Sequence, residues 1–325
     1  MHLRIGTRHS PLALWQAHWV ADQLNSAGHQ VELVKITTTG DTTTTPLGHG
    51  GGVGLFTKEI QKALLDGRCD IAVHSLKDLP TQPIPGLALA AVPKRESPND
   101  CLISTKYKSL SDLPQNARVG TGSPRRKAQL LHLRPDLDLQ DIRGNVETRL
   151  AKLNTHPFDA IVLAYAGLLR LGLDSLKLAP EDLCVLPTDV MLPAVGQAAL
   201  GLETRKEDAN TREALLPLID PPSLLCVRAE RELLRLLQAG CLAPVAAHAT
   251  IANQLILLRA KVFSDDGSKL ISTIHQLPID PTTLSQADAL TDAAPISLAA
   301  NVAQSLKSLG AEELIATTRL NLPKA

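Results

Sequence analysis

The sequence has no excess of charge of either sign. Its 325 residues include 33 Lys and Arg against 33 Asp and Glu, so the formal net charge is zero. Such a chain has no global field that would attract nucleic acid or a membrane surface, and we expect neither as a partner. Any anion-binding site must come from a local concentration of positive charge.

Long apolar runs and paired cysteine motifs are also missing. No stretch of about 18 apolar residues is present, and "MHLRIGTRHS" lacks the pattern of a signal peptide, so we expect a cytoplasmic protein. The five cysteines are an odd number without any C-x-x-C spacing. This disfavours a disulfide framework and a zinc site, and no metal is expected.

Short apolar runs alternate with segments of helical period through the first half of the chain. This alternation predicts α/β architecture with largely parallel sheets. The expected strands are 2–7, 31–36, 70–75, 117–122 and 159–167, and the expected helices are 12–24, 55–67 and 125–133.

Two segments of this region repeat each other. "RIGTRHSP" at 4–11 and "RVGTGSPRR" at 118–126 both contain Arg, an aliphatic residue and Gly-Thr, followed by Ser-Pro before a helix. We interpret them as corresponding strand-turn-helix corners of two related domains, which would face one another across a cleft.

The last third of the chain has a different pattern. An amphipathic helix begins at Pro221 and Pro222 and is expected to end at Gly240. Three strands follow at 245–251, 254–263 and 270–277, with a "DDG" turn and a closing helix near 296–309. These features predict an α+β domain with an antiparallel sheet.

Arg125 and Arg126 fall in the first turn of a predicted helix, where a cation typically costs about 0.3–1 kcal/mol against the helix dipole. An expected anion explains them, because a helix N-terminus and two guanidinium groups together bind carboxylate or phosphate. The alternative is ordinary surface charge. Other polar groups recur at the ends of predicted elements and favour a polyanion cleft: Arg8, Ser10, Arg143, Arg149 and Arg170.

Lys77 and Asp78 follow an apolar strand, at the end where α/β sheets bind ligands. An aspartate among arginines and bound carboxylates can share a proton or stabilise a cation. Its alternative role is that of a turn former or helix cap.

Two loops leave their roles open. "GHGGGVGLFTKE" fits no nucleotide-binding spacing, so it is either a loop over the cleft or only a loop. Cys241 follows a helix stop, where the helix C-terminus should raise a thiol pKa, which argues against a cycling nucleophile but not against one permanent bond. The alternative for Cys241 is a small buried hydrophobe.

Together these segments resemble the porphobilinogen deaminase family. The resemblance covers nearly the whole chain and rests on "IGTRHSPLALWQAH", "GLFTKEI", "DIAVHSLKDLPT", "GTGSPRR", "RGNVETRL", "LPAVGQ" and "GC" followed by Pro244. It implies two domains of the periplasmic-binding-protein type (type II) flanking a cleft, and a third domain with a loop cysteine. The implied domains are 1–98 with 198–218, then 103–193, then 221–325.

The resemblance also implies an activity. The family condenses four porphobilinogen molecules into hydroxymethylbilane, with release of ammonia, on a dipyrromethane primer held by a thioether. Cys241 would carry the primer, and Asp78 and Lys77 would be catalytic, with Asp78 stabilising a cationic intermediate. The resemblance assigns Asp41, Thr121, Ser123, Arg125 and Arg126 to the cofactor, and Arg8, Ser10, Arg143, Arg149, Arg170 and Gln197 to the substrate.

Some positions depart from the family pattern. Val53 replaces a loop lysine, Thr39 an arginine, Gly122 a serine and Ala198 a glycine, which puts the loop contacts in doubt but leaves Asp78 and Cys241 in place. The rival functions are a non-catalytic two-domain anion-binding protein and a thiol-dependent acyl transferase. We expect a monomer that uses porphobilinogen.

Overall fold

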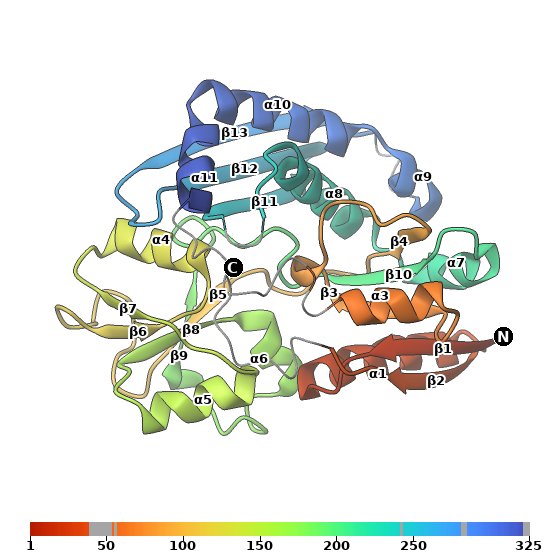
Figure 1. Ribbon diagram of the computed structural model, residues 1–325, viewed down its shortest axis with the longest axis horizontal. Coiled ribbons are helices and arrows are strands. Elements are labelled where there is room, and N and C mark those ends of the chain that lie inside the picture. The colour runs from red at the N-terminus through yellow and green to blue at the C-terminus, as the bar shows by residue number, and fades with distance from the viewer. Residues whose placement is uncertain (39–53, 55–56, 241–242, 281–284, 321–325) are drawn as a thin grey trace.

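The protein, a computed structural model, is described for residues 1–38, 54, 57–240, 243–280 and 285–320. It contains three sheets, each the centre of one unit (Figure 1). Two are five-stranded sheets with helices, and the third is a three-stranded antiparallel sheet. The prediction of two α/β units and one α+β unit is therefore confirmed.

The first unit combines two separate parts of the chain. Its sheet has the order β2-β1-β3-β10-β4. It consists of β1 (His2–Thr7), α1 (Pro11–Ser26), β2 (Gln30–Lys35), α3 (Lys58–Leu65), β3 (Ile71–Ser75), the 3-10 helix η1 (Leu76–Asp78), β4 (Leu87–Ala91), β10 (Leu200–Arg205), α7 (Ala209–Leu215) and η3 (Leu216–Leu218).

The second unit lies between these two parts in the sequence. Its sheet has the order β7-β6-β8-β5-β9. It consists of β5 (Asp100–Ile103), β6 (Arg118–Gly120), α4 (Pro124–Leu133), β7 (Asp138–Gln140), α5 (Val146–Thr155), β8 (Ala160–Ala164), α6 (Tyr165–Leu171), η2 (Pro180–Asp182) and β9 (Leu183–Leu186).

In each five-stranded sheet four strands run in the same direction and one runs against them, so the expectation of largely parallel sheets is confirmed apart from one strand in each. β1 runs parallel to β2 and β3, whereas β10 runs antiparallel to β3 and β4. In the second sheet, β5 is likewise antiparallel to β8 and β9. β10 and β5 are the strands by which the chain enters each sheet from the other unit. They are not joined to a neighbour by a βαβ crossover, the connection that imposes a parallel direction.

The third unit is α8 (Pro221–Leu236), β11 (Val245–Ala252), β12 (Leu255–Phe263), β13 (Leu270–Pro278), α9 (Gln286–Thr291), α10 (Ala294–Ser308) and α11 (Ala311–Leu320). The strand order β11-β12-β13 and the antiparallel pairing agree with the sequence. Helix α8 ends at Leu236, earlier than the expected Gly240. Asp220 caps its N-terminus, since its carboxylate accepts a hydrogen bond from the Ser223 backbone N–H.

The apolar cores do not follow the three sheets one to one. A single buried cluster joins the first and third units and includes Leu3 and Ile71 of the first together with Leu224 and Leu258 of the third. The second unit has separate clusters, one around Val119 and Val162 and another around Cys101 and Ile161. The first and third units thus share an apolar core, whereas the second unit has apolar clusters of its own.

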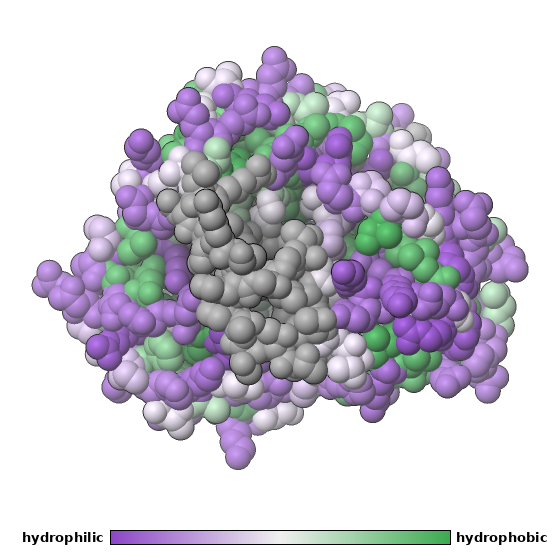
Figure 2. Space-filling model, in the orientation of Figure 1, coloured by the Kyte–Doolittle hydropathy of each residue, from purple (hydrophilic) through white to green (hydrophobic). Residues whose placement is uncertain are grey.

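One face of the molecule is drawn by hydropathy in Figure 2. Figure 2 shows hydrophilic side chains over most of the face drawn, with apolar areas in separate patches. Among the residues given above, no helix is both long and apolar enough to cross a membrane.

Candidate active site

The predicted site residues of the first unit follow two neighbouring parallel strands. Arg8 and Ser10 come directly after β1, and Lys77 and Asp78 form η1 directly after β3. Parallel strands bring their carboxyl ends to one edge of a sheet, where open α/β sheets bind ligands. Arg8, Lys77 and Asp78 are all partly exposed there.

The second unit repeats this arrangement. Thr121 and Ser123 follow β6, Arg143 follows β7, and Arg149 lies on α5 before β8. Because β6 is parallel to β7 and to β8, these groups lie toward one edge of the second sheet. The predicted correspondence between the two strand-turn-helix corners is therefore present in the structure.

At each corner a serine hydroxyl caps the N-terminus of a helix. Ser10 accepts a hydrogen bond from the Ala13 backbone N–H at 3.4 Å, and Ser123 accepts one from the Arg126 N–H at 3.5 Å. Thr121 is fully buried, and its hydroxyl accepts from the Ser123 N–H at 3.3 Å. A side-chain oxygen at the N-cap satisfies an otherwise unpaired helix N–H, so these hydroxyls first shape the corners.

Charged groups from both units act on one another. The pKa of Arg149 is lowered to about 10, mainly by burial and also by the charges of Arg126 and Arg143, while Asp78 acts in the opposite direction. The pKa of Lys77 is lowered to about 8, mainly by burial; Asp78 acts against this lowering and Arg126 contributes to it. The structure thus brings together the predicted catalytic pair of the first unit and the predicted arginines of the second.

Arg125 and Arg126 are not surface charges. They are 4% and 5% exposed, and both form ion pairs at 2.8 Å with Asp100, the fully buried first residue of β5. Burial alone would raise the pKa of Asp100, but the two arginines outweigh it and hold that pKa well below its usual value. Asp100 was not predicted from the sequence. The available signal was a carboxylate at the start of an apolar strand, which must find a cation when buried.

Arg170 and Gln197 lie where the two units meet. Arg170 donates a hydrogen bond to the Ala198 carbonyl at 2.6 Å, and its guanidinium lies 5.9 Å from the centre of the Trp15 ring on α1. Gln197 is 1% exposed, and its Nε2 donates to the Pro98 carbonyl and to Asp100. Contact of either residue with substrate stays a prediction.

Two departures from the family pattern affect the backbone here. Ala198 has a φ of 71°, a left-handed conformation that favours glycine. A Cβ at Gly122 would lie 3.0 Å from the Ile142 carbonyl oxygen, so the glycine fits a close approach between the turn after β6 and the segment after β7. Thr39, Asp41, Val53 and Cys241 lie outside the described residues.

A cavity of about 390 Å³ lies between η1 and the C-terminal end of α8. Lys77 and Leu79 line it from the first unit, and Arg231 and Arg235 line it from the third. Gly240, which directly precedes Cys241 in the chain, also lines it. The predicted attachment residue is therefore adjacent in sequence to a cavity that includes the predicted catalytic lysine.

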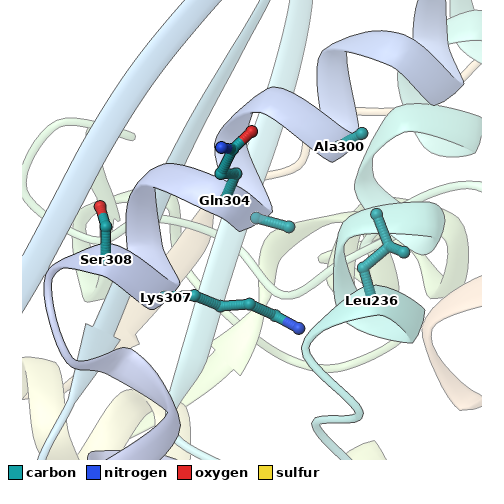
Figure 3. A pocket seen from close by; sticks show the side chains of 6 residues that line it. Leu236, Ala300, Gln304, Lys307 and Ser308 are labelled. Atoms are coloured by element: carbon teal, nitrogen blue, oxygen red, sulfur yellow. The ribbon is translucent and has the colours of Figure 1, made fainter.

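A second hollow, of about 430 Å³, lies apart from the predicted active site. Figure 3 shows it between α10 and the end of α8, with Leu236 on one side and Lys307 extending across it from α10. Its lining contains none of the predicted site residues. The hollow is a surface feature of the third unit.

The donor set fits a polycarboxylate cofactor such as dipyrromethane. The Nε atoms of Arg125 and Arg143 are buried and have no hydrogen-bond partner among the described residues. Buried donors of this kind are costly unless a ligand satisfies them, and guanidinium groups match carboxylates in geometry and charge. Within the described part of the chain, no cluster of three His, Cys, Asp or Glu residues is placed to hold a metal ion.

Comparison with known proteins identifies the family. Residues 3–213 match the family model for "Porphobilinogen deaminase, dipyromethane cofactor binding domain", and residues 224–291 match "Porphobilinogen deaminase, C-terminal domain". The chain belongs to the porphobilinogen deaminase family. The curated porphobilinogen deaminase of Syntrophotalea carbinolica is 48% identical over 317 residues, which cover 97% of this chain and 95% of that protein.

Membership in the porphobilinogen deaminase family confirms the resemblance seen in the motifs. It identifies the chain as an enzyme with a dipyrromethane cofactor and excludes the reading as a non-catalytic anion-binding protein. Similar solved structures include a YaeC-family lipoprotein of Enterococcus faecalis V583, which is 13% identical and covers 67% of this chain and 90% of its own, with a TM-score of 0.40. The methionine binding protein MetQ is 14% identical, with coverages of 67% and 89% and a TM-score of 0.43.

Proposed function

We propose that the chain joins porphobilinogen units head to tail into hydroxymethylbilane, with the dipyrromethane attached to Cys241 through a thioether. The observation that carries this proposal is a group of cations near one carboxylate. The charge of Asp78 acts on Lys77 and on Arg149, Arg126 acts on both of these cations, and Arg143 acts on Arg149. Action as a monomer in the cytoplasm belongs to the same proposal.

The cations explain how a growing polyanion is held. Each pyrrole unit brings an acetate and a propionate, so every addition increases the negative charge in the site. Arginine forks bind carboxylates in two-point geometry, and Lys77 adds a point charge. Arg125 and Arg143 each keep a buried Nε donor without a partner in the described structure, and these donors are available to such carboxylates.

Asp78 has a different role from the cations. The bound dipyrromethane supplies the free pyrrole carbon to which substrate is joined. As ammonia leaves the aminomethyl carbon of a substrate molecule, positive charge develops on that molecule, and a fixed carboxylate stabilises it. Asp78 lies on a short helix at the end of a buried strand, which restricts its position. The same carboxylate is suited to accept the pyrrole proton that is lost when the new carbon–carbon bond forms.

Intact mass tests the attachment residue. The purified wild type should be heavier than its sequence by one dipyrromethane, and Cys241→Ser should lose the added mass. Cys184→Ser is the matched control, because Cys184 is a partly exposed thiol on β9 of the second unit and should keep the adduct. An unmodified wild type with full activity would contradict the proposal.

Turnover tests the carboxylate. Asp78→Asn should keep the adduct while hydroxymethylbilane formation falls by orders of magnitude, each tenfold loss corresponding to about 1.4 kcal/mol of barrier. Asp22→Asn, on the exposed face of α1, should leave both properties unchanged. Near-normal turnover in Asp78→Asn would remove Asp78 from the catalytic role.

A further inference from the structure

Asp100 contacts three side chains at the junction of the first and second units. Its carboxylate pairs with Arg125 Nη1 at 2.8 Å and with Arg126 Nη2 at 2.8 Å. Arg126 Nε also donates to it at 3.0 Å, and Gln197 Nε2 at 2.8 Å. Asp100 is 0% exposed, so these donors take the place of water around its carboxylate.

The same contacts fix the orientation of both arginines. Arg125 Nη1 also donates to the Leu192 carbonyl at 2.7 Å, and Arg126 Nη1 donates to the Val162 carbonyl at 3.0 Å. Each guanidinium is thus held by a carboxylate and by a backbone oxygen of a different segment. Two cations around one carboxylate leave one unit of positive charge in excess for a ligand.

Gln197 links this cluster to both segments in which the chain crosses between the first and second units, the outgoing and the returning crossing. Its side chain donates to Pro98 and Asp100 on the outgoing crossing, and Gln197 itself lies on the returning one. Its carbonyl accepts a hydrogen bond from Arg95 Nε at 2.8 Å. Arg95 in turn pairs at 2.6 Å with Glu230 of α8, which is fully buried. A chain of polar contacts therefore runs from the arginine pair to the helix that leads toward Cys241.

We propose that Asp100 is a positioning residue, which orients Arg125 and Arg126 for the carboxylates of the cofactor and holds them against the two crossings through Gln197. This inference rests on the proposed function, in which the arginines bind the cofactor.

Asp100 could instead only neutralise the arginines, and that role predicts the opposite change in anion binding when the carboxylate is removed. If the carboxylate only neutralised the arginines, its removal would free positive charge and strengthen anion binding. If it positions them, its removal leaves two mutually repelling guanidinium groups without a fixed direction, and binding weakens. The direction of change therefore separates the two roles.

The experiment uses Asp100→Asn, which keeps the shape and removes the charge. We expect folded protein with dipyrromethane on less than a tenth of the molecules by intact mass. In the primer-free Cys241→Ser background, glutarate should bind at least tenfold more weakly by calorimetry when Asp100 is replaced. Asp100→Glu should recover part of the occupancy although it is the larger side chain, which a purely structural defect would not allow.

Glu203→Gln provides the matched control. Glu203 is a buried carboxylate in β10, 6% exposed, that accepts hydrogen bonds from Gln61 and lies 3.3 Å from His74. Its neutralisation should lower thermal stability without lowering adduct occupancy or glutarate affinity. If both variants lost adduct occupancy and glutarate affinity equally, general destabilisation would account for the effect of Asp100→Asn, and the inference would be overturned.

The remaining outcomes are also decisive. Full occupancy with equal or tighter glutarate binding in Asp100→Asn would overturn the positioning role. If Asp100→Asn does not fold, Gln197→Met in the Cys241→Ser background decides, because it removes the link and leaves both ion pairs. We then expect glutarate to bind three- to tenfold more weakly, and unchanged affinity would overturn the inference. A wild type without any adduct would instead contradict the proposed function itself.

Discussion

At the scale of single residues, Lys77 shows how burial changes a charge. Its pKa is lowered to about 8, mainly because burial removes water from the ammonium; Asp78 and Asp100 act to raise this pKa, and Arg126 and Arg125 act to lower it. A lysine with a lowered pKa is protonated below that value and becomes neutral as the pH rises through it. Lys77 therefore loses its charge between about pH 7 and pH 9, before an exposed lysine would.

This loss of charge predicts a pH-dependent affinity. In primer-free Cys241→Ser, glutarate should bind several-fold more weakly at pH 9 than at pH 7, because the Lys77 ammonium loses its proton and its positive charge between these two pH values. The measurement is calorimetry at both pH values. Lys77→Met in the same background should bind weakly at both, with a smaller change between them. An equal change in the two proteins would assign the titration to another group.

The sequence suggested candidate site residues but not how they are paired. Lys77, Asp78 and the arginines could be found because each follows an apolar strand or begins a helix. Asp100 could not, because it pairs with residues that are 25 and 26 positions away on a different element. Arg95 and Glu230 are separated by 135 positions. Long-range ion pairs depend on packing, which local patterns do not contain.

At the scale of elements, the hairpin between β12 and β13 joins the third unit to the second. Gly267 in its turn has a φ of 71°, and its carbonyl lies 2.9 Å from His132 Nδ1 near the end of α4. The rings of His132 and Phe263 also meet edge to face, with centroids 5.6 Å apart. The predicted "DDG" turn thus does more than reverse the chain, because it contacts the helix that carries Arg125 and Arg126.

A substitution in this turn should break the contact. A Cβ at position 267 would lie 2.5 Å from the Ala128 carbonyl oxygen and 2.7 Å from the backbone nitrogen of His132. Gly267→Ala should therefore lower the free energy of unfolding and increase hydrogen exchange at the end of α4. Gly28→Ala is the control, since Gly28 has a φ of 86° and open space around it. It should cost only the backbone strain, about 1–2 kcal/mol.

The outcome is clear in either direction. Greater destabilisation in Gly267→Ala than in Gly28→Ala, together with faster exchange in α4, supports the docking contact. Equal destabilisation and unchanged exchange would mean that the hairpin and α4 only lie near each other.

Elements were the most predictable level of this protein. Ser10, Ser123 and Asp220 cap helices where capping residues precede apolar periodicity. The three strands of the last unit also lie where they were expected, and β12 and β13 show alternating burial. The largely parallel direction of the two sheets was predicted, but the reversed strands β10 and β5 were not, because they enter from another unit. Their direction depends on the path of the whole chain.

At the scale of the whole molecule, the distribution of apolar cores divides the protein differently from its sheets. The first and third units share one buried cluster, whereas the second has its own. The sequence indicated three units but gave no sign of this sharing, because a core is defined by contacts between distant segments. Polar contacts of Arg95, Asp100 and Gln197 lie where the second unit meets the other two.

The position of β10 has a consequence for the order in which the protein is made. β10 lies between β3 and β4, and in the described sheet β4 pairs only with β10. A ribosome therefore completes every strand of the second sheet before it has made the strand that closes the first. Nascent chains that have emerged only to residue 198 should contain a protease-resistant second unit, while the first becomes resistant after β10 emerges. Pulse proteolysis of stalled chains measures this order, and early resistance of residues 1–91 would contradict it. The unit that begins the polypeptide is thus expected to mature after the unit that follows it.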